Sequence, residues 1–115
     1  MMSVQECSLL SEKVQNFLLH IGDSPSTVAV YLAGQGVRGY RSSASGCPIA
    51  NLLRSVFPLD ADYSFLVIPW GVGVYHDCRA VVTVSLPQAV RTFVQEFDQG
   101  AYPALRTLRE PSYEQ

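Results

Sequence analysis

The stretch of residues 42–48 has the residue types that most suggest chemistry. Cys47 stands directly before Pro48, which is a typical first residue of a helix, and backbone N–H groups at a helix start favour a thiolate. A nearby arginine, Arg38, Arg41 or Arg54, would lower the pKa of the thiol further. Three interpretations stay open: a nucleophilic cysteine, an anion held between loop amides and an arginine, or a cysteine that is a small buried apolar residue.

A second group of potentially reactive residues is His76-Asp77-Cys78. Adjacent residues on a strand point to opposite faces, so we expect His76 and Asp77 not to form a relay. A pair of Cys47 and His76 is an alternative, because a nucleophile and its base need only be neighbours in space. That pair would make the chain a thiol-dependent enzyme or redox protein. Two histidines without a carboxylate cluster predict no metal site, and no motif indicates a cofactor.

Residues 34–39 read Gly-Gln-Gly-Val-Arg-Gly, which matches the G-x-G-x-x-G pattern of dinucleotide-binding turns. That function requires a helix to open directly at the motif, whereas residues 40–46 are rich in turn formers. We therefore interpret the glycines as a helix stop followed by two turns. The alternative is a small anionic-ligand or nucleotide-binding domain, in which the loop 36–46 contacts the anion through Arg38 and Arg41.

Aromatic residues offer a different kind of site. Trp70 follows Pro69 at the expected tip of a hairpin, where a large ring is difficult to bury locally. It either anchors a contact with a partner or folds back to close the core. Tyr40 and Tyr75 would extend a contact surface of this kind.

Hydrophobic spacing, caps and turn residues predict the elements that must position these side chains. Helices are expected over residues 5–21, 47–57 and 87–99, strands over 63–68, 72–76 and 80–85, and a short helical turn at 102–105. Residues 26–33 are ambiguous, because β-branched residues favour a strand while Ser24-Pro25 and the glycines after residue 33 favour a helix. We predict a helix.

This order, αααβββα, predicts an α+β fold in a single domain spanning residues 1–109, with a frayed tail at 110–115. The connections between the three strands are short, and short connections produce antiparallel hairpins. We therefore expect a three-stranded antiparallel meander with the helices covering one face.

The composition excludes several classes of protein. Of the 115 residues, 48% are hydrophobic and 16% are charged, which is unlike a disordered chain, and no apolar run is long enough to span a membrane. A net charge of −2 gives no reason to expect a nucleic-acid partner. The first residues lack a signal-peptide pattern, and three cysteines leave at least one unpaired, so we expect a cytoplasmic protein.

The function that these observations favour is a non-enzymatic protein-interaction or regulatory module. The chain has few charges and no catalytic constellation, and its apolar content exceeds what one small core readily hides. Self-association is the simplest way to cover the remaining apolar surface, with a twofold homodimer as the default. We expect the first helix or the edge of the three-stranded sheet to form the interface.

Two short patterns carry a resemblance. Residues 47–50 read Cys-Pro-Ile-Ala, and the segment from Leu86 to Val94 follows the pattern L-P-x-x-V-x-x-F-V. Over about residues 25–105 the chain resembles small uncharacterised proteins of actinobacteria and their phages, in which a helical half precedes strands and a helix of this pattern. The resemblance implies a bacterial origin and assigns no activity to any residue.

Overall fold

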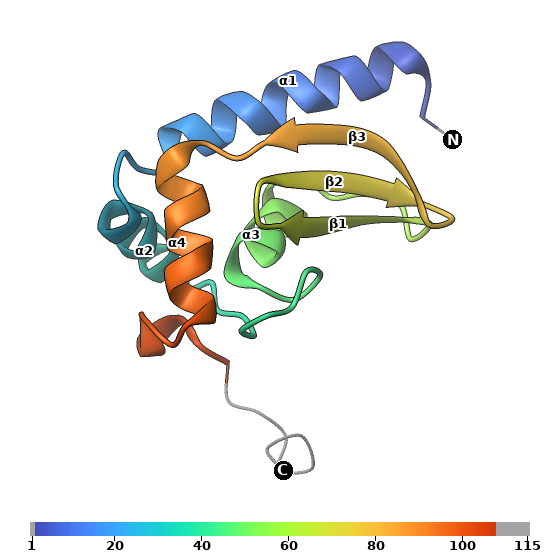
Figure 1. Cartoon of the computed structure of the whole chain (residues 1–115). Helices are drawn as coiled ribbons and strands as arrows, with labels where there is room; N and C mark the ends of the chain where they lie inside the picture. Colours follow the sequence, from blue (N-terminus) through green and yellow to red (C-terminus); the bar gives the residue numbers. More distant parts are fainter. Residues whose placement is uncertain (1, 108–115) are drawn as a thin grey trace, which may run out of the picture.

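A computed structural model of the chain describes residues 2–107 (Figure 1). The elements are α1 (Val4–His20), α2 (Pro25–Gly34), α3 (Pro48–Val56), β1 (Tyr63–Ile68), β2 (Gly71–His76), β3 (Arg79–Ser85), α4 (Gln88–Asp98) and a 3₁₀ turn, η1 (Pro103–Leu105). The order αααβββα and the α+β class are as predicted. The expected frayed tail, residues 110–115, lies outside the described residues, as do 108 and 109.

The ambiguous segment after Ser24 is a helix, α2, and its first turn explains why. The side chain of Ser24 accepts a hydrogen bond from the backbone N–H of Thr27, whose hydroxyl in turn accepts one from the backbone N–H of Ser24. This capping box and Pro25 start the helix, which then buries Val28 and Leu32, four residues apart, on one face. These contacts outweigh the strand preference of the β-branched residues.

The three strands form an antiparallel sheet in the order β1-β2-β3. Because side chains alternate along a strand, the register places one set of apolar side chains on a single face. This set is buried and consists of Phe65, Val67, Val72, Val74, Val82 and Val84. A bulge in the β2–β3 pairing lies between Val74 and Tyr75, and Asp77-Cys78 make the turn, so that Arg79 already belongs to β3.

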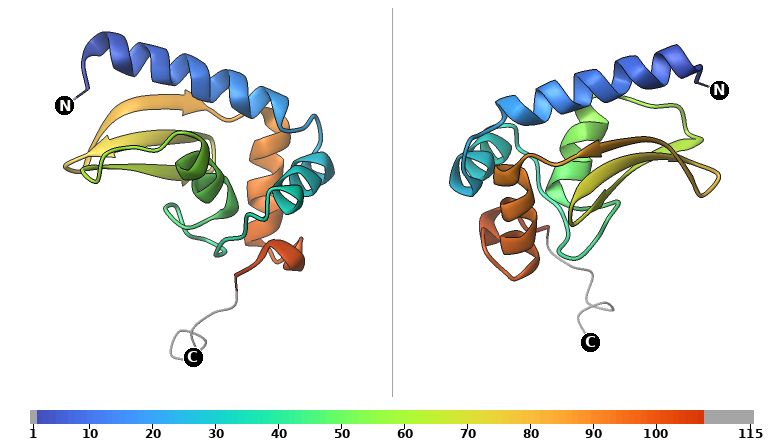
Figure 2. Two further views of the ribbon diagram at one scale, coloured as in Figure 1. Left: turned by 180° about the vertical axis from the view of Figure 1, so that it is seen from behind. Right: turned by 45° about the horizontal axis from the view of Figure 1, so that its top comes forward.

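The helices cover this buried face. α1 packs along β3, α3 packs on β1, and α2 packs on α4, which stands at the end of the sheet (Figure 2). The core consists of the six sheet residues and the apolar stripes of the helices, among them Leu18, Leu53 and Phe93. In the part of the chain that the structure describes, no helix is long and apolar enough to cross a membrane.

The opposite face of the sheet has no helix over it among residues 2–107, and it faces the viewer in Figure 1. We call this surface the open face. It is made by Ser64, Leu66, Ile68, Gly71, Gly73, Tyr75, Ala80, Thr83 and Ser85. Its largest apolar side chains, Leu66, Ile68 and Tyr75, are only half-buried and do not pack against the core.

Candidate functional site

The loop between α2 and α3 is held firmly against α3. The side-chain amide of Asn51 donates hydrogen bonds to the backbone oxygens of Arg38, at 2.6 Å, and Gly46, at 3.1 Å. The guanidinium of Arg54 donates to the backbone oxygen of Ser45 at 2.7 Å and also to the side-chain oxygen of Asn51. The first and last parts of the loop are therefore fixed by two polar side chains on one face of α3.

The same loop is also tied to α4 and to the sheet. The backbone N–H of Ser42 donates to the carboxylate of Asp98 at 2.8 Å. The backbone N–H of Val67, on β1, donates to the carbonyl of Ala44 at 2.8 Å. The loop therefore bridges the C-terminal end of α4 and the free edge of β1.

A groove lies where the loop, α4 and the end of β1 meet. Its outer hollow has a volume of about 490 Å³ and is lined by Tyr40, Arg41, Ser42, Ser43, Asp98 and Arg106. Its inner hollow, of about 270 Å³, shares Ser42, Ser43 and Asp98 and is otherwise lined by Ala44, Cys47, Val67, Ile68, Pro69, Val94 and Gln95. The outer end of the groove is therefore polar and charged, and the inner end is mostly apolar.

The charges in the groove are two guanidinium groups and one carboxylate. Arg41 lies against Gly100, where a Cβ atom would be 3.3 Å from its Nη1. Arg106 is held in place by a backbone bridge between its segment and Gly39. Within residues 2–107, neither arginine forms an ion pair with a carboxylate, Asp98 included. The groove thus has an excess of one positive charge.

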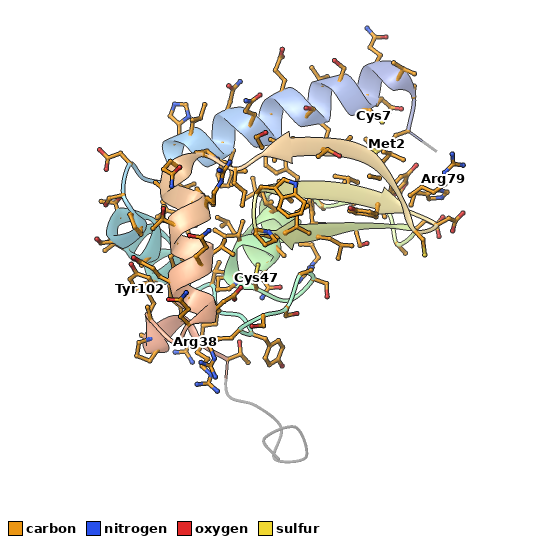
Figure 3. The ribbon with its side chains drawn as sticks, in the orientation of Figure 1. Met2, Cys7, Arg38, Cys47, Arg79 and Tyr102 are labelled. Atoms are coloured by element: carbon orange, nitrogen blue, oxygen red, sulfur yellow. The ribbon has the colours of Figure 1, made fainter. Side chains whose placement is uncertain are left out.

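Cys47 lines the inner hollow. It lies next to the start of α3 (Figure 3). Its side chain is 3% exposed, and its Sγ accepts a hydrogen bond from the backbone N–H of Ala50 at 3.5 Å. Burial raises the pKa of the Cys47 thiol, and the nearby carboxylate of Asp98 raises it further, whereas the backbone N–H groups of Ala50 and Ile49 and the charge of Arg54 act in the opposite direction. The geometry therefore stabilises a neutral thiol, and a nucleophile requires a thiolate.

His76 is far from Cys47. It pairs with Tyr63 at one end of the sheet, while the loop before Cys47 bonds to Val67 near the other end, and four residues of strand span about 13 Å. The imidazole ring instead packs on the ring of Tyr63, with 4.9 Å between the centroids. The two residues of the thiol-enzyme alternative are therefore not brought together.

The expectation that His76 and Asp77 point apart is wrong. Nδ1 of His76 lies 3.7 Å from Oδ2 of Asp77. The alternation rule does not apply because Asp77 is a turn residue with φ of 51°, so its side chain does not follow the pleat of β2. The distance is too long for a hydrogen bond.

The glycines of the G-x-G-x-x-G pattern have separate structural roles. Gly36, with φ of 71°, ends α2: its N–H and that of Val37 donate to the last carbonyls of the helix, in a Schellman motif. At Gly39 the backbone approaches residues 46–48 so closely that a Cβ atom would lie 2.4 Å from the nitrogen of Pro48. The next helix begins only at Pro48, as the helix-stop interpretation expects.

The aromatic candidates fall at two places. Trp70 is 62% exposed beside the open face, so the alternative in which it folds back to close the core is wrong. Tyr75 lies on the open face with its ring over Gly73, where a Cβ atom would be 2.6 Å from the ring. Tyr40 lines the groove instead.

Of the two loop arginines in the anion hypothesis, Arg41 lines the groove and Arg38 does not. Sequence reasoning missed Asp98 and Arg106, which complete the polar end. No spacing signal could have revealed them, because they are more than fifty residues from the loop and only the tertiary fold brings them to it.

Among residues 2–107, no three histidine, cysteine, aspartate or glutamate side chains gather as metal ligands. Comparisons of the chain with protein-family models, with curated proteins and with solved structures give no significant match. The kinship with small actinobacterial and phage proteins therefore stays a prediction.

Proposed function

We propose that the protein is a non-enzymatic interaction module that self-associates through the open face of its sheet. The observation that carries this proposal is the chemistry of that face: none of its nine residues is charged. A sheet face that remains in water ordinarily carries polar and charged side chains opposite its buried ones. An uncharged face with half-buried Leu66, Ile68 and Tyr75 is better suited to contact with another protein surface.

A second copy of the chain is the partner that this chemistry favours. In a twofold dimer the same surface patch lies on both sides of the interface, so charged side chains on it would bring like charges close together unless each found an opposite charge. The open face presents no such charges, and Trp70 at its edge supplies a large rigid side chain of the kind that anchors interfaces. The two sheets would then bury each other's uncovered apolar side chains.

The experiment is to measure the mass of the full chain in solution by light scattering over a range of concentrations. Trp70 is the only tryptophan, so its fluorescence reports directly on the proposed interface. We expect a dimer whose formation shifts the emission to shorter wavelength as the indole leaves water. Trp70→Ala should weaken the dimer, whereas Val30→Ala, a change at a 70%-exposed site on α2, should not.

A protein that stays monomeric at high concentration, with unchanged emission, would contradict self-association. If Trp70→Ala and Val30→Ala leave the dimer equally stable, the interface lies elsewhere. That result would contradict the role of the open face.

We also propose a cytoplasmic location. Cys7, Cys47 and Cys78 are all free thiols, which is the usual state in a reducing compartment. The exposed Cys78 would be the first to oxidise outside such a compartment.

A further inference from the structure

We propose that the groove between the 40–47 loop, α4 and the end of β1 binds a small organic carboxylate with an apolar body. The charged end of this site lies outside the open face, because it is built by the loop, α4 and the segment after η1, whereas Ile68 at the inner end belongs to both surfaces.

The head group is recognised in the outer hollow. Arg41 and Arg106 both line it, from segments 65 residues apart, and guanidinium groups bind carboxylates through paired, charge-assisted hydrogen bonds. Ser43 adds a hydroxyl whose oxygen accepts a hydrogen bond from the N–H of Gly46 at 3.0 Å, which leaves its proton available to a ligand. Two cations and a hydroxyl therefore line one hollow.

The body of the ligand occupies the inner hollow. Its apolar walls come from Val67, Ile68 and Pro69 on one side and Val94 on the other, and Cys47 also lines it. The neutral thiol favoured there fits an apolar neighbour. Because the two hollows share Ser42, Ser43 and Asp98, a ligand with its head in the outer hollow can extend its body into the inner one.

The net charge favours a carboxylate over a phosphate. Two arginines and Asp98 leave one excess positive charge, which matches a monoanion. A phosphate dianion would place more negative charge beside Asp98, and like charges repel strongly at short distance. The carboxylate of Asp98 is already oriented by the N–H of Ser42, at 2.8 Å, so it is a fixed part of the wall.

The groove is preformed to a large extent. The loop is held on three elements by hydrogen bonds. Asn51 and Arg54 on α3 donate to its carbonyls, Asp98 on α4 accepts from one of its N–H groups, and the N–H of Val67 on β1 donates to it. A site with fixed walls loses less conformational freedom when it binds a ligand.

The test is isothermal titration of the full chain with sodium octanoate. Octanol, which has the same chain without the charge, and inorganic phosphate are the comparison ligands. Octanoate should bind more tightly than both, and shorter carboxylates should bind more weakly, by about fourfold for each methylene group removed. No binding of octanoate at millimolar concentration, equal binding of octanol, or tighter binding of phosphate would each overturn the proposal.

Variants locate the site. Arg41→Gln and Arg106→Gln should each weaken octanoate binding by about tenfold, since each removes charge-assisted hydrogen bonds. Arg79→Gln is the matched control, because it removes the same charge at the far end of the sheet (Figure 3). An equal loss of octanoate affinity in all three variants would mean that binding depends on the net charge of the protein and not on the groove. That result would overturn the proposal.

Protection of Cys47 gives a second readout that does not depend on the arginines. Octanoate in the inner hollow should slow alkylation of Cys47 by N-ethylmaleimide, while the exposed Cys78 should react at its usual rate. Equal rates for Cys47 with and without saturating octanoate would contradict the placement of the body. Trp70→Ala should leave octanoate binding unchanged, which separates this site from the proposed dimer interface.

Discussion

The carboxylate of Asp98, at the last residue of α4, accepts a hydrogen bond at 2.8 Å from the backbone N–H of Ser42, 56 residues earlier in the chain. Ser42 has φ of 53°, a left-handed conformation that is costly for a residue with a side chain. The bond therefore helps to hold a strained loop residue at the end of a helix, and it sets one wall of the groove.

Removal of this acceptor should destabilise the fold modestly. Asp98→Ala is expected to lower the free energy of unfolding by about 1 kcal/mol, the usual net value of one hydrogen bond. Asp98→Asn keeps an oxygen acceptor and should therefore lose less stability than Asp98→Ala. Glu12→Ala, at an exposed site on α1, is the control. Urea denaturation measures all three, and Asp98→Ala equal in stability to the control would refute the structural role.

Asp98→Asn also tests whether the charge of Asp98 affects ligand binding in the groove. Asp98→Asn removes the negative charge beside the proposed carboxylate site, so octanoate should bind more tightly than to the unchanged protein. Titration calorimetry measures the difference. Weaker binding by Asp98→Asn would show that the carboxylate helps the ligand, which contradicts recognition of a simple monoanion.

Two glycines of the G-x-G-x-x-G pattern should respond in opposite ways to alanine. Gly39→Ala places a Cβ atom 2.4 Å from a backbone nitrogen, and backbone cannot move aside cheaply, so we expect a loss of about 2–4 kcal/mol. Gly34 is the last residue inside α2 and has nothing within 4 Å of an added Cβ, so Gly34→Ala should stabilise the helix by up to about 1 kcal/mol. Thermal unfolding of both variants checks this, and similar effects would rule out the packing explanation.

The buried thiol should make the fold less stable in alkaline solution. The pKa of Cys47 is raised in the folded state, so folding favours the protonated thiol. The contribution of the Cys47 thiol to the stability of the fold is fully present below the pKa of about 8.5 that a cysteine has in the unfolded chain. This contribution is lost as the pH rises toward the higher pKa of the folded state. Cys47→Ser keeps a cap for α3 without a group that titrates in this range.

Stability measured by urea denaturation between pH 8 and pH 10.5 should therefore fall less steeply in Cys47→Ser than in the unchanged protein. Cys78→Ser is the matched control at an exposed site and should keep the original slope. If stability falls with pH at the same slope in all three proteins, the pKa of the Cys47 thiol does not differ between the folded and unfolded states, which would contradict this prediction.

A single charge on the open face should prevent self-association without unfolding the chain. Thr83 is exposed at the centre of β3, so Thr83→Lys adds a charge at no cost to the core. In a twofold dimer each copy would bring an unpaired lysine into an interface of uncharged residues, and burial of an unpaired charge disfavours association. Val30→Lys on α2 is the control, and light scattering together with circular dichroism distinguishes a folded monomer from an unfolded chain.

Local patterns in the sequence determined the elements. Apolar residues three and four apart marked the helices, and short apolar runs between turn residues, with alternation at 72–76, marked the strands. Pro25, Gly36 and Pro48 marked helix ends that the structure places within a residue or two. The short connections between strands made the antiparallel meander the only simple topology. These features depend on neighbours in sequence, so they are readable without the fold.

The groove and the open face were decided by the tertiary structure. Arg41, Asp98 and Arg106 meet because α4 and the segment after η1 pack beside the loop, and packing of distant segments leaves no periodic signal in the sequence. The exposure of Trp70 was likewise settled by which face of the sheet the helices cover. Sequence alone showed which residues could do chemistry, whereas long-range packing decided that Cys47 and His76 lie apart and that the arginines gather around a groove.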